Sequence, residues 1–133
     1  MILRTVRTFQ NSDAIKEIVV VTREDLILPI MRLCADMDKV KAVVCGGGSR
    51  QESVQLGLNA LSNKVKLVAV QDGARPLITD AVIDRTVRAA HSYGAAAPAI
   101  PVKDTIKVVK GGVVKETPDR ATLQAVQDRK SVV

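Results

Sequence analysis

The sequence predicts an α/β fold in which a mostly parallel sheet is covered by helices on both faces. Short β-branched runs alternate along the chain with segments whose apolar residues recur at helical spacing, as they do in βαβ units. The apolar residues are almost all Val, Ile, Leu and Ala, with one Tyr, one Phe and no Trp, a composition common in buried parallel sheets. The length of 133 residues is that of a single domain.

The first half of the chain alternates two helices with two strands. Each helix is predicted from apolar residues three or four positions apart, and each strand from a β-branched run. The elements are a helix with Ile2, Val6 and Phe9, a strand over 17–22, a helix with Ile27, Met31 and Cys34, and a strand over 41–45. Pro29 is tolerated only in the first turn of its helix. The second strand runs directly into Gly46-Gly47-Gly48.

A third and a fourth helix follow, separated by a third strand. Ser49 stands three residues before Glu52, the spacing of a capping box, in which hydroxyl and carboxylate each accept a hydrogen bond from an unpaired backbone N–H. The third strand is expected over 65–70, and the fourth helix begins near Thr79 and ends at Gly94. The expected buried faces are Val54, Leu58 and Leu61, then Ile83, Val87 and Ala90. A strand of small residues is expected over 95–100.

A β-hairpin arm is expected near the end of the chain. The segments 106–109 and 113–116 are β-branched and are joined by a glycine turn, so that an arm of about residues 102–120 projects from the sheet. Such an arm would bring Thr105 and Arg120 together near its base, where a hydroxyl and a guanidinium suit a phosphate. Alternatively, Thr105 belongs to a simple turn and Arg120 to a solvent-exposed ion pair.

Two strand ends carry polar residues suited to a ligand. Asp72 and Arg75 follow the expected strand 65–70, and the carboxyl ends of strands are where α/β sheets bind ligands. The glycine loop before Ser53 lets a ligand approach the backbone, and free N–H groups at the helix start favour anions. Read separately, each segment is equally well explained as a tight turn. Together they place Ser53 and Asp72 on one rim and favour a nucleotide or sugar-phosphate site.

Composition limits the other classes of function. The net charge of +6 suits an anionic ligand, but the basic residues form no block, and nucleic-acid binding is not expected. Cys34, Cys45 and the single His91 have no metal-ligand spacing, so both cysteines are expected to be buried free thiols in a reducing compartment. Neither a membrane-spanning apolar stretch nor a signal peptide is found, which predicts a cytoplasmic chain that does not bind membranes.

Four segments, in this order, resemble motifs of the 2-C-methyl-D-erythritol 4-phosphate cytidylyltransferases. They are Gly46-Gly47-Gly48-Ser49-Arg50-Gln51-Glu52-Ser53-Val54, Asp72-Gly73-Ala74-Arg75-Pro76, Pro101-Val102-Lys103-Asp104-Thr105-Ile106-Lys107 and Thr117-Pro118-Asp119-Arg120. The resemblance runs from Leu3 to Gln127, and Gln71 stands where the family often has His. It implies a Rossmann-like fold of the nucleotide-diphospho-sugar transferase type.

The resemblance also implies a reaction of non-mevalonate isoprenoid biosynthesis, in which CMP passes from CTP to 2-C-methyl-D-erythritol 4-phosphate and pyrophosphate is released, with Mg²⁺ neutralising the triphosphate. The residues implied for CTP are Gly47, Gly48, Ser53, Asp72 and Gly73, and those implied for the substrate phosphate are Arg75, Thr105 and Arg120. Gly47 and Ser53 would contact cytosine. Asp72 would be a catalytic residue and a Mg²⁺ ligand, and Arg120 would orient the attacking phosphate. The arm would exchange across a homodimer, so that Thr105 and Arg120 serve the neighbouring subunit.

The same resemblance predicts an incomplete domain. The family begins with a strand and a glycine-rich loop whose Arg and Lys hold the triphosphate, and it continues past Gln127 with Thr-Pro-Gln; neither segment occurs in this sequence. We therefore expect a partial domain over 1–127, an exposed sheet edge and an inactive polypeptide. Residues 128–133 resemble a translated sequencing adapter and are interpreted as a non-native tail, with a divergent natural tail as the alternative. A ribitol 5-phosphate cytidylyltransferase and a non-catalytic nucleotide-binding or dimerisation module are the alternative functions.

Overall fold

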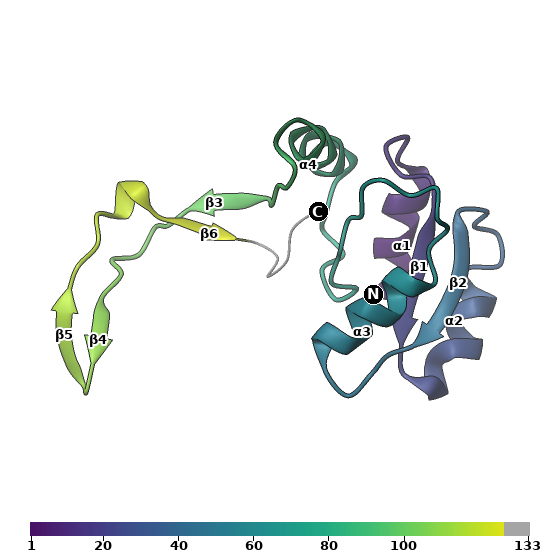
Figure 1. Ribbon diagram of the computed structural model, residues 1–133, viewed down its shortest axis with the longest axis horizontal. Helices are drawn as coiled ribbons and strands as arrows, with labels where there is room; N and C mark the ends of the chain where they lie inside the picture. Colours follow the sequence, from purple (N-terminus) through teal and green to yellow (C-terminus); the bar gives the residue numbers. More distant parts are fainter. Residues whose placement is uncertain (127–133) are drawn as a thin grey trace.

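The structure is a computed structural model that describes residues 1–126 (Figure 1). The tail interpreted as non-native, 128–133, lies outside the described residues. The first six elements are α1 (Ile2–Asn11), β1 (Ile18–Thr22), the 3-10 helix η1 (Glu24–Leu26), α2 (Ile27–Leu33), β2 (Val40–Cys45) and α3 (Arg50–Asn59). The remaining elements are α4 (Asp80–Tyr93), β3 (Ala99–Pro101), β4 (Val108–Lys110), β5 (Val113–Glu116), the 3-10 helix η2 (Arg120–Thr122) and β6 (Gln124–Val126).

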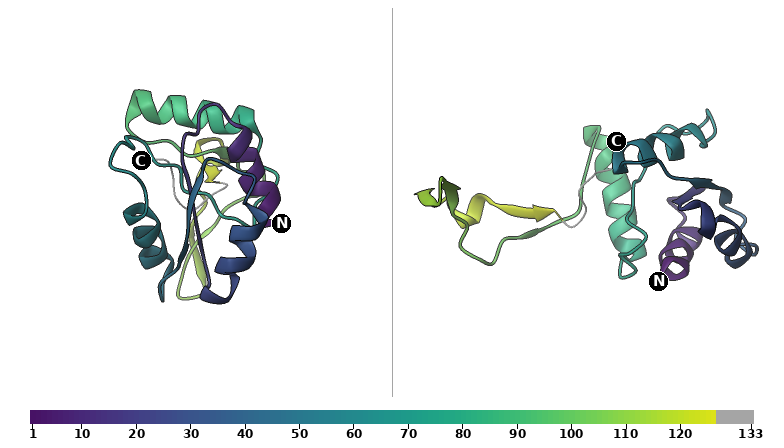
Figure 2. Two further views of the ribbon diagram at one scale, coloured as in Figure 1. Left: turned by 90° about the vertical axis from the view of Figure 1, so that its right-hand side faces the viewer. Right: turned by 90° about the horizontal axis from the view of Figure 1, so that it is seen from below.

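The fold is mixed α/β, with one small parallel sheet and two antiparallel strand pairs. β1 and β2 are parallel, in a register from Ile18 opposite Val40 to Thr22 opposite Cys45. Helices α1 and α2 lie on one face of this pair and α3 on the other (Figure 2, left). The remaining described ladders, β3 with β6 and β4 with β5, are antiparallel. The expected mostly parallel sheet is therefore limited to β1 and β2.

The expected strand 65–70 is wrong for the structure: these residues belong to no strand. Within residues 1–126, the only backbone hydrogen bond that the segment makes joins Val65 N to Ser62 O at 3.3 Å. A β-branched run becomes a strand only where a neighbouring strand supplies hydrogen bonds, because β-propensity mostly measures such pairing. The strand expected over 95–100 is likewise reduced to β3, which begins at Ala99.

Local capping sets the helix boundaries where the sequence predicts them. The Thr79 Oγ1 accepts a hydrogen bond from Val82 N at 3.4 Å and begins α4. Gly94 ends α4 with a φ of 88°, a left-handed conformation that glycine adopts without a steric penalty. Pro29 is the third residue of α2, within the first turn, so it removes no internal helical hydrogen bond.

The hydrophobic core is small and lies where α1, β1 and α2 meet. Its buried members are Val6, Val20, Ile30, Cys34 and Met37. On α4, Ile83 and Ala90 are buried as expected. The face expected to be buried on α3 is not: Leu58 is 38% exposed, and the only buried residue of the helix is Gly57. That face of α3 is incompletely covered because the segment 65–70 does not complete the sheet.

The hairpin arm is present as expected. β4 and β5 are joined by Gly111 and Gly112, whose φ values of 57° and 75° are those of a two-residue hairpin turn. The arm extends away from β1, β2 and α3 (Figure 1). None of the helices within residues 1–126 has the length and apolar composition of a membrane-spanning segment.

Candidate functional site

The glycine loop begins at the carboxyl edge of the parallel strand pair. Gly46 follows β2 directly, and its N–H donates to the carbonyl of Thr22, the last residue of β1, at 2.8 Å. The loop therefore leaves the sheet at the edge where α/β proteins bind their ligands. This is the position that the sequence predicts for the loop.

The first turn of α3 closes the loop. The Ser49 Oγ accepts from Glu52 N at 3.1 Å, as a capping residue does. The Glu52 carboxylate accepts from Gly48 N at 2.8 Å, so the second bond of the expected capping box falls one residue earlier than the standard pattern. Gly47 N donates to Ser53 Oγ at 3.1 Å. These bonds hold the loop against the start of the helix.

These bonds occupy the backbone N–H groups of the glycine loop. The N–H groups of Gly46, Gly47 and Gly48 are all donated within the chain, so the loop does not offer them to an anion in this conformation. The approach of Ser53 also explains the glycine at position 46. A Cβ there would lie 2.8 Å from Ser53 Oγ, which is closer than real Cβ contacts come.

Asp72 lies between two guanidinium groups. The Arg50 Nη1 donates to Asp72 Oδ1 at 2.5 Å, and Arg75 Nε lies 3.4 Å from Asp72 Oδ2. The Asp72 side chain is 26% exposed, and both arginines are more exposed than that. Arg75 N also donates to the Asp72 carbonyl at 3.0 Å. Residues 72–75 therefore form a turn, which agrees with the interpretation of this segment as a tight turn. Through Arg50 the turn is also attached to α3, the helix after the glycine loop, which the interpretation as part of a ligand-binding rim requires.

Arg50 is the site residue that sequence reasoning missed. It lies in one of the quoted motifs and is the first residue of α3, directly after the capped loop. In the sequence, the position of Arg50 at the start of the helix was the only sign of a role in the site, because Arg50 and its partner Asp72 are 22 residues apart. It brings the two sequence-predicted segments to one rim.

Gly73 is packed against the beginning of α1. Its carbonyl accepts a hydrogen bond from Thr5 Oγ1 at 3.0 Å, and a Cβ on it would lie 2.5 Å from Ile2 Cδ1. The turn after Asp72 is thus held by α1 on one side and by Arg50 on the other.

Thr105 and Arg120 lie apart from this rim. The Arg120 Nη1 donates to the carbonyl of Lys103 at 2.8 Å, two residues before Thr105, so the arm does bring these stretches together. Both residues are exposed. The arm projects away from the body that carries Asp72, and within one chain the structure does not join Thr105 or Arg120 to the rim (Figure 1).

The carboxylate available for a metal is that of Asp72. Residues 1–126 contain no group of three or more His, Cys, Asp or Glu side chains that would hold an ion. Mg²⁺ commonly binds through one or two carboxylates and the phosphates of a substrate, so Asp72 fits as a single ligand to a phosphate-bound ion. Its Oδ1 is at present occupied by Arg50.

The two cysteines differ in environment. Cys34 is buried in the core, and burial, with a smaller contribution from the charge of Asp36, raises the pKa of its thiol. Cys45 is exposed at the end of β2, next to the glycine loop. The expectation that both thiols are buried is therefore wrong for Cys45, since β2 ends at the solvent-exposed edge of the sheet.

Fold and site together define a mixed α/β protein whose glycine loop and acidic turn share the carboxyl edge of parallel strands, the arrangement of nucleotide-binding α/β proteins. The family profile for 2-C-methyl-D-erythritol 4-phosphate cytidylyltransferase matches residues 1–131. The chain belongs to this family.

Individual relatives agree with this assignment. The cytidylyltransferase of Symbiobacterium thermophilum is 41% identical over 128 residues, which are 96% of this chain and 53% of the relative. That of Bacillus cereus is 40% identical over 129 residues, 96% of this chain and 57% of the relative. The crystal structure of 4-diphosphocytidyl-2C-methyl-D-erythritol synthase from Anaerococcus prevotii superposes with a TM-score of 0.90 at 28% identity, covering 98% of this chain and 57% of the other. The chain thus spans about half the length of its relatives.

Proposed function

We propose that this chain is part of a cytoplasmic enzyme that transfers CMP from CTP to 2-C-methyl-D-erythritol 4-phosphate and releases pyrophosphate. The observation that carries the proposal is the Arg50–Asp72 contact, which joins the glycine loop to the acidic turn on one rim. Family membership supplies the identity of the substrates, because the relatives are named for this reaction.

The proposed chemistry is positioning combined with electrostatic stabilisation. An oxygen of the substrate phosphate bonds to the α-phosphorus of CTP, while the bond from that phosphorus to the bridging oxygen breaks and pyrophosphate leaves. Mg²⁺ neutralises the triphosphate. In this assignment Asp72 lies near the ribose and the metal, and Arg75 supplies a guanidinium to the substrate phosphate.

The glycine loop suits a base that donates hydrogen bonds. Its three N–H groups are used internally, whereas the carbonyls of Gly47 and Gly48 accept no hydrogen bond within the described part of the chain. The exocyclic amino group of cytosine donates hydrogen bonds, and carbonyl oxygens of this kind accept them. Gly47, Gly48 and Ser53 therefore form the proposed cytosine pocket, and Gly73 closes the CTP site beside Asp72.

The substrate phosphate is proposed to lie between two chains. Thr105 and Arg120 are exposed on a projecting arm, which also exposes Val109, Val113 and Val114. An arm with apolar side chains in solvent is suited to packing on a second copy of the chain. In the homodimer, Thr105 and Arg120 would complete the neighbouring site, with Arg120 orienting the attacking phosphate.

A polypeptide made of these 133 residues alone is proposed to lack turnover. The family resemblance assigns the triphosphate-holding Arg and Lys to a segment outside them, and neutralising charge on the triphosphate is the main task of catalysis here. CTP binding does not need that segment for the base contacts.

The deciding experiment has two arms. Calorimetric titration of the 133-residue chain with CTP, and with ATP as the control, tests the proposed cytosine pocket. We expect binding heat with CTP only, and equal heats with both nucleotides would contradict a cytosine-specific pocket.

The second arm measures pyrophosphate release with 2-C-methyl-D-erythritol 4-phosphate and with ribitol 5-phosphate. It compares this chain with a chimera completed by the remaining segments of the Symbiobacterium thermophilum relative. Turnover by the chimera with the erythritol phosphate only is expected. CTP binding or dimer formation without chimera turnover would favour the non-catalytic module.

A further inference from the structure

Helix α2 is apolar on every side and yet lies mostly in solvent. Of its 7 residues, Arg32 alone is polar, and within the helix only Ile30 is buried. Leu28 is 64% exposed, Met31 51% and Leu33 50%. A helix with apolar residues all round is normally covered on all sides. In this chain one side of α2 packs on the core, and the opposite side is exposed.

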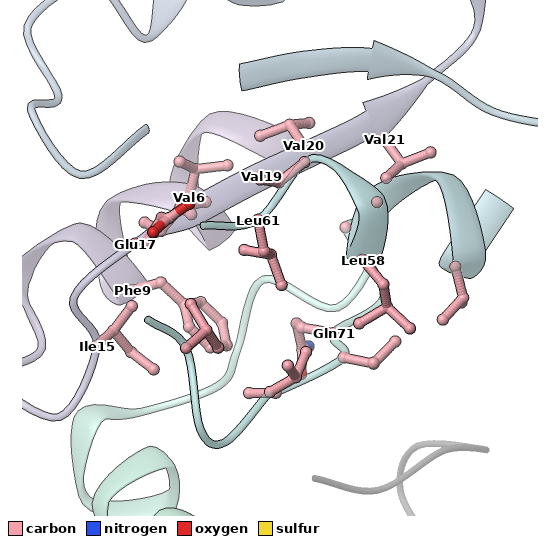
Figure 3. A pocket seen from close by; sticks show the side chains of 18 of the residues that line it. Val6, Phe9, Ile15, Glu17, Val19, Val20, Val21, Leu58, Leu61 and Gln71 are labelled. Atoms are coloured by element: carbon pink, nitrogen blue, oxygen red, sulfur yellow. The ribbon is translucent and has the colours of Figure 1, made fainter. Parts of the chain in front are cut away.

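The exposure of α2 differs in origin from that of α3. Leu58 of α3 and Leu61 just after it line a cavity between β1 and the segment 65–71, together with Val6 and Phe9 of α1 (Figure 3). No residue of α2 lines that cavity. A segment that filled the cavity would therefore cover α3 and leave the outer side of α2 exposed.

Two charges of opposite sign flank Leu28 at equal distances in the sequence. Glu24 stands four residues before it, in the 3-10 helix that runs directly into α2, and Arg32 stands four residues after it. Both are exposed, and neither forms an ion pair or a side-chain hydrogen bond within residues 1–126. The adjacent Arg23 and Asp25, by contrast, pair with each other at 2.8 Å. The outer side of α2 therefore has an acidic end, an apolar middle and a basic end.

This pattern is complementary to itself. When two identical helices pack antiparallel about a two-fold axis at Leu28, the acidic end of each meets the basic end of the other. Eight residues span about 12 Å along a helix, and packed helices lie about 8–10 Å apart, so side chains at both ends of the pair reach each other. Antiparallel packing also brings together the helix termini of opposite partial charge.

We propose that the outer side of α2, formed by Glu24, Leu28, Met31 and Arg32, is a docking surface for the same surface of a second copy of this chain. Leu28 packs against its counterpart at the axis, Met31 extends the apolar contact, and Glu24 forms an ion pair with Arg32 of the other copy at each end. An unrelated partner would need the reverse order of charges, which a second copy supplies by symmetry.

This surface is separate from the arm and from the proposed nucleotide site. The arm extends from the opposite side of the body, so the two contacts between copies do not compete (Figure 1). The α2 surface is smaller than a standard interface, so we expect association at concentrations of about 100 µM. It is therefore measured in chains that carry Val114→Asp, which places a charge on the apolar arm and weakens pairing through it.

The test exchanges the two charges on separate chains. Glu24→Arg and Arg32→Glu are each made in the 133-residue Val114→Asp chain, and sedimentation equilibrium measures association at up to about 1 mM. In each variant alone, like charges face each other at both ends of the helix pair, so we expect association at least about tenfold weaker than in the Val114→Asp chain. In an equimolar mixture of the two variants, every acidic side chain again faces a basic one. We expect the mixture to associate within about twofold of the Val114→Asp chain.

A matched pair of leucines tests the apolar contact. Leu28→Lys in the same background sets two like charges against each other at the axis, and we expect it to abolish association. Leu77→Lys is the control, because Leu77 is 77% exposed but lies outside α2, before α4. Unchanged association is expected there, and melting temperatures show that each variant is folded.

Three results would overturn the proposal. A Val114→Asp chain that is monomeric at about 1 mM would mean that α2 does not bind a second copy. Association that the mixture does not restore would mean that the helices do not pack antiparallel. The third result is association of the 133-residue chain but not of the chimera with the Symbiobacterium thermophilum segments, when both carry Val114→Asp. It would mean that the remaining segments of the family cover α2.

Discussion

The Arg50 guanidinium donates to the Asp72 carboxylate at 2.5 Å, and this contact joins the start of α3 to the turn after residue 71. It accounts for the presence of two sequence-distant segments on one rim. Because Arg75 also lies beside the second oxygen of Asp72, the carboxylate is already oriented before a ligand arrives.

Replacement of Arg50 by Gln is expected to weaken CTP binding more than folding. The ion pair is partly exposed, so its loss should cost stability of less than about 1 kcal/mol, whereas the displaced Asp72 turn should lower CTP affinity by about tenfold. Calorimetric titration and thermal melts measure the two effects. Arg88→Gln is the control, because Arg88 forms an exposed pair with Asp84 on α4. Equal CTP affinity in both variants would contradict a role of Arg50 at the rim.

The Gly46→Ala substitution is expected to destabilise the chain by about 1–3 kcal/mol, since the added Cβ would come within 2.8 Å of Ser53 Oγ. Gly48→Ala is the matched control, because a Cβ there meets only Glu52 Oε2, at an ordinary 3.6 Å. Urea unfolding measures both. If the two variants unfold at the same urea concentration, the packing of the loop against α3 is not the reason for glycine at position 46.

The two thiols are expected to react at different rates. Cys45 is exposed and should be alkylated by iodoacetamide in the folded chain at neutral pH. Cys34 is buried, and its raised pKa further reduces its thiolate fraction, so it should react only after denaturation. Mass spectrometry of the alkylated peptides distinguishes the two positions, and equal labelling under native conditions would contradict the packing of α2.

Alkaline pH is expected to weaken the fold through Cys34. Because the pKa of its thiol is raised in the folded state, its protonated form is favoured there. The contribution is therefore fully present below the pKa of the thiol in the unfolded chain and is lost as the pH rises through the pKa in the folded chain. The free energy of unfolding should fall between neutral and alkaline pH more steeply for the native chain than for Cys34→Ala. Parallel slopes in the two proteins would exclude this thiol as the cause.

Charge on the arm is expected to prevent the proposed dimer. Val114 is 53% exposed on β5, and Val114→Asp places a carboxylate in the apolar surface that would pack on the second chain. Sedimentation should show at least about tenfold weaker self-association. Lys115→Glu on the same strand is the control for a change of charge alone. A monomeric native chain, or an unchanged dimer in Val114→Asp, would contradict the exchange of arms.

Local signals predicted the helices and the hairpin well. Ser49, Thr79 and Gly94 act within one turn of their own positions, and Gly111 and Gly112 close a hairpin whose two strands are neighbours in sequence. The strand expected over 65–70 is the principal failure. Its residues have the right propensity, but the hydrogen bonds of a central strand come from elsewhere in the chain.

The sequence by itself determined the α/β class, the glycine loop, the acidic turn and the family, because these depend on residue type and short spacing. Only the tertiary structure decided that Arg50 binds Asp72, that the loop N–H groups are already used and that Cys45 is exposed. The Arg50–Asp72 contact joins segments 22 residues apart, and the loop bonds depend on side-chain orientations at the start of α3. Such geometry depends on how helices and strands pack rather than on residue type alone.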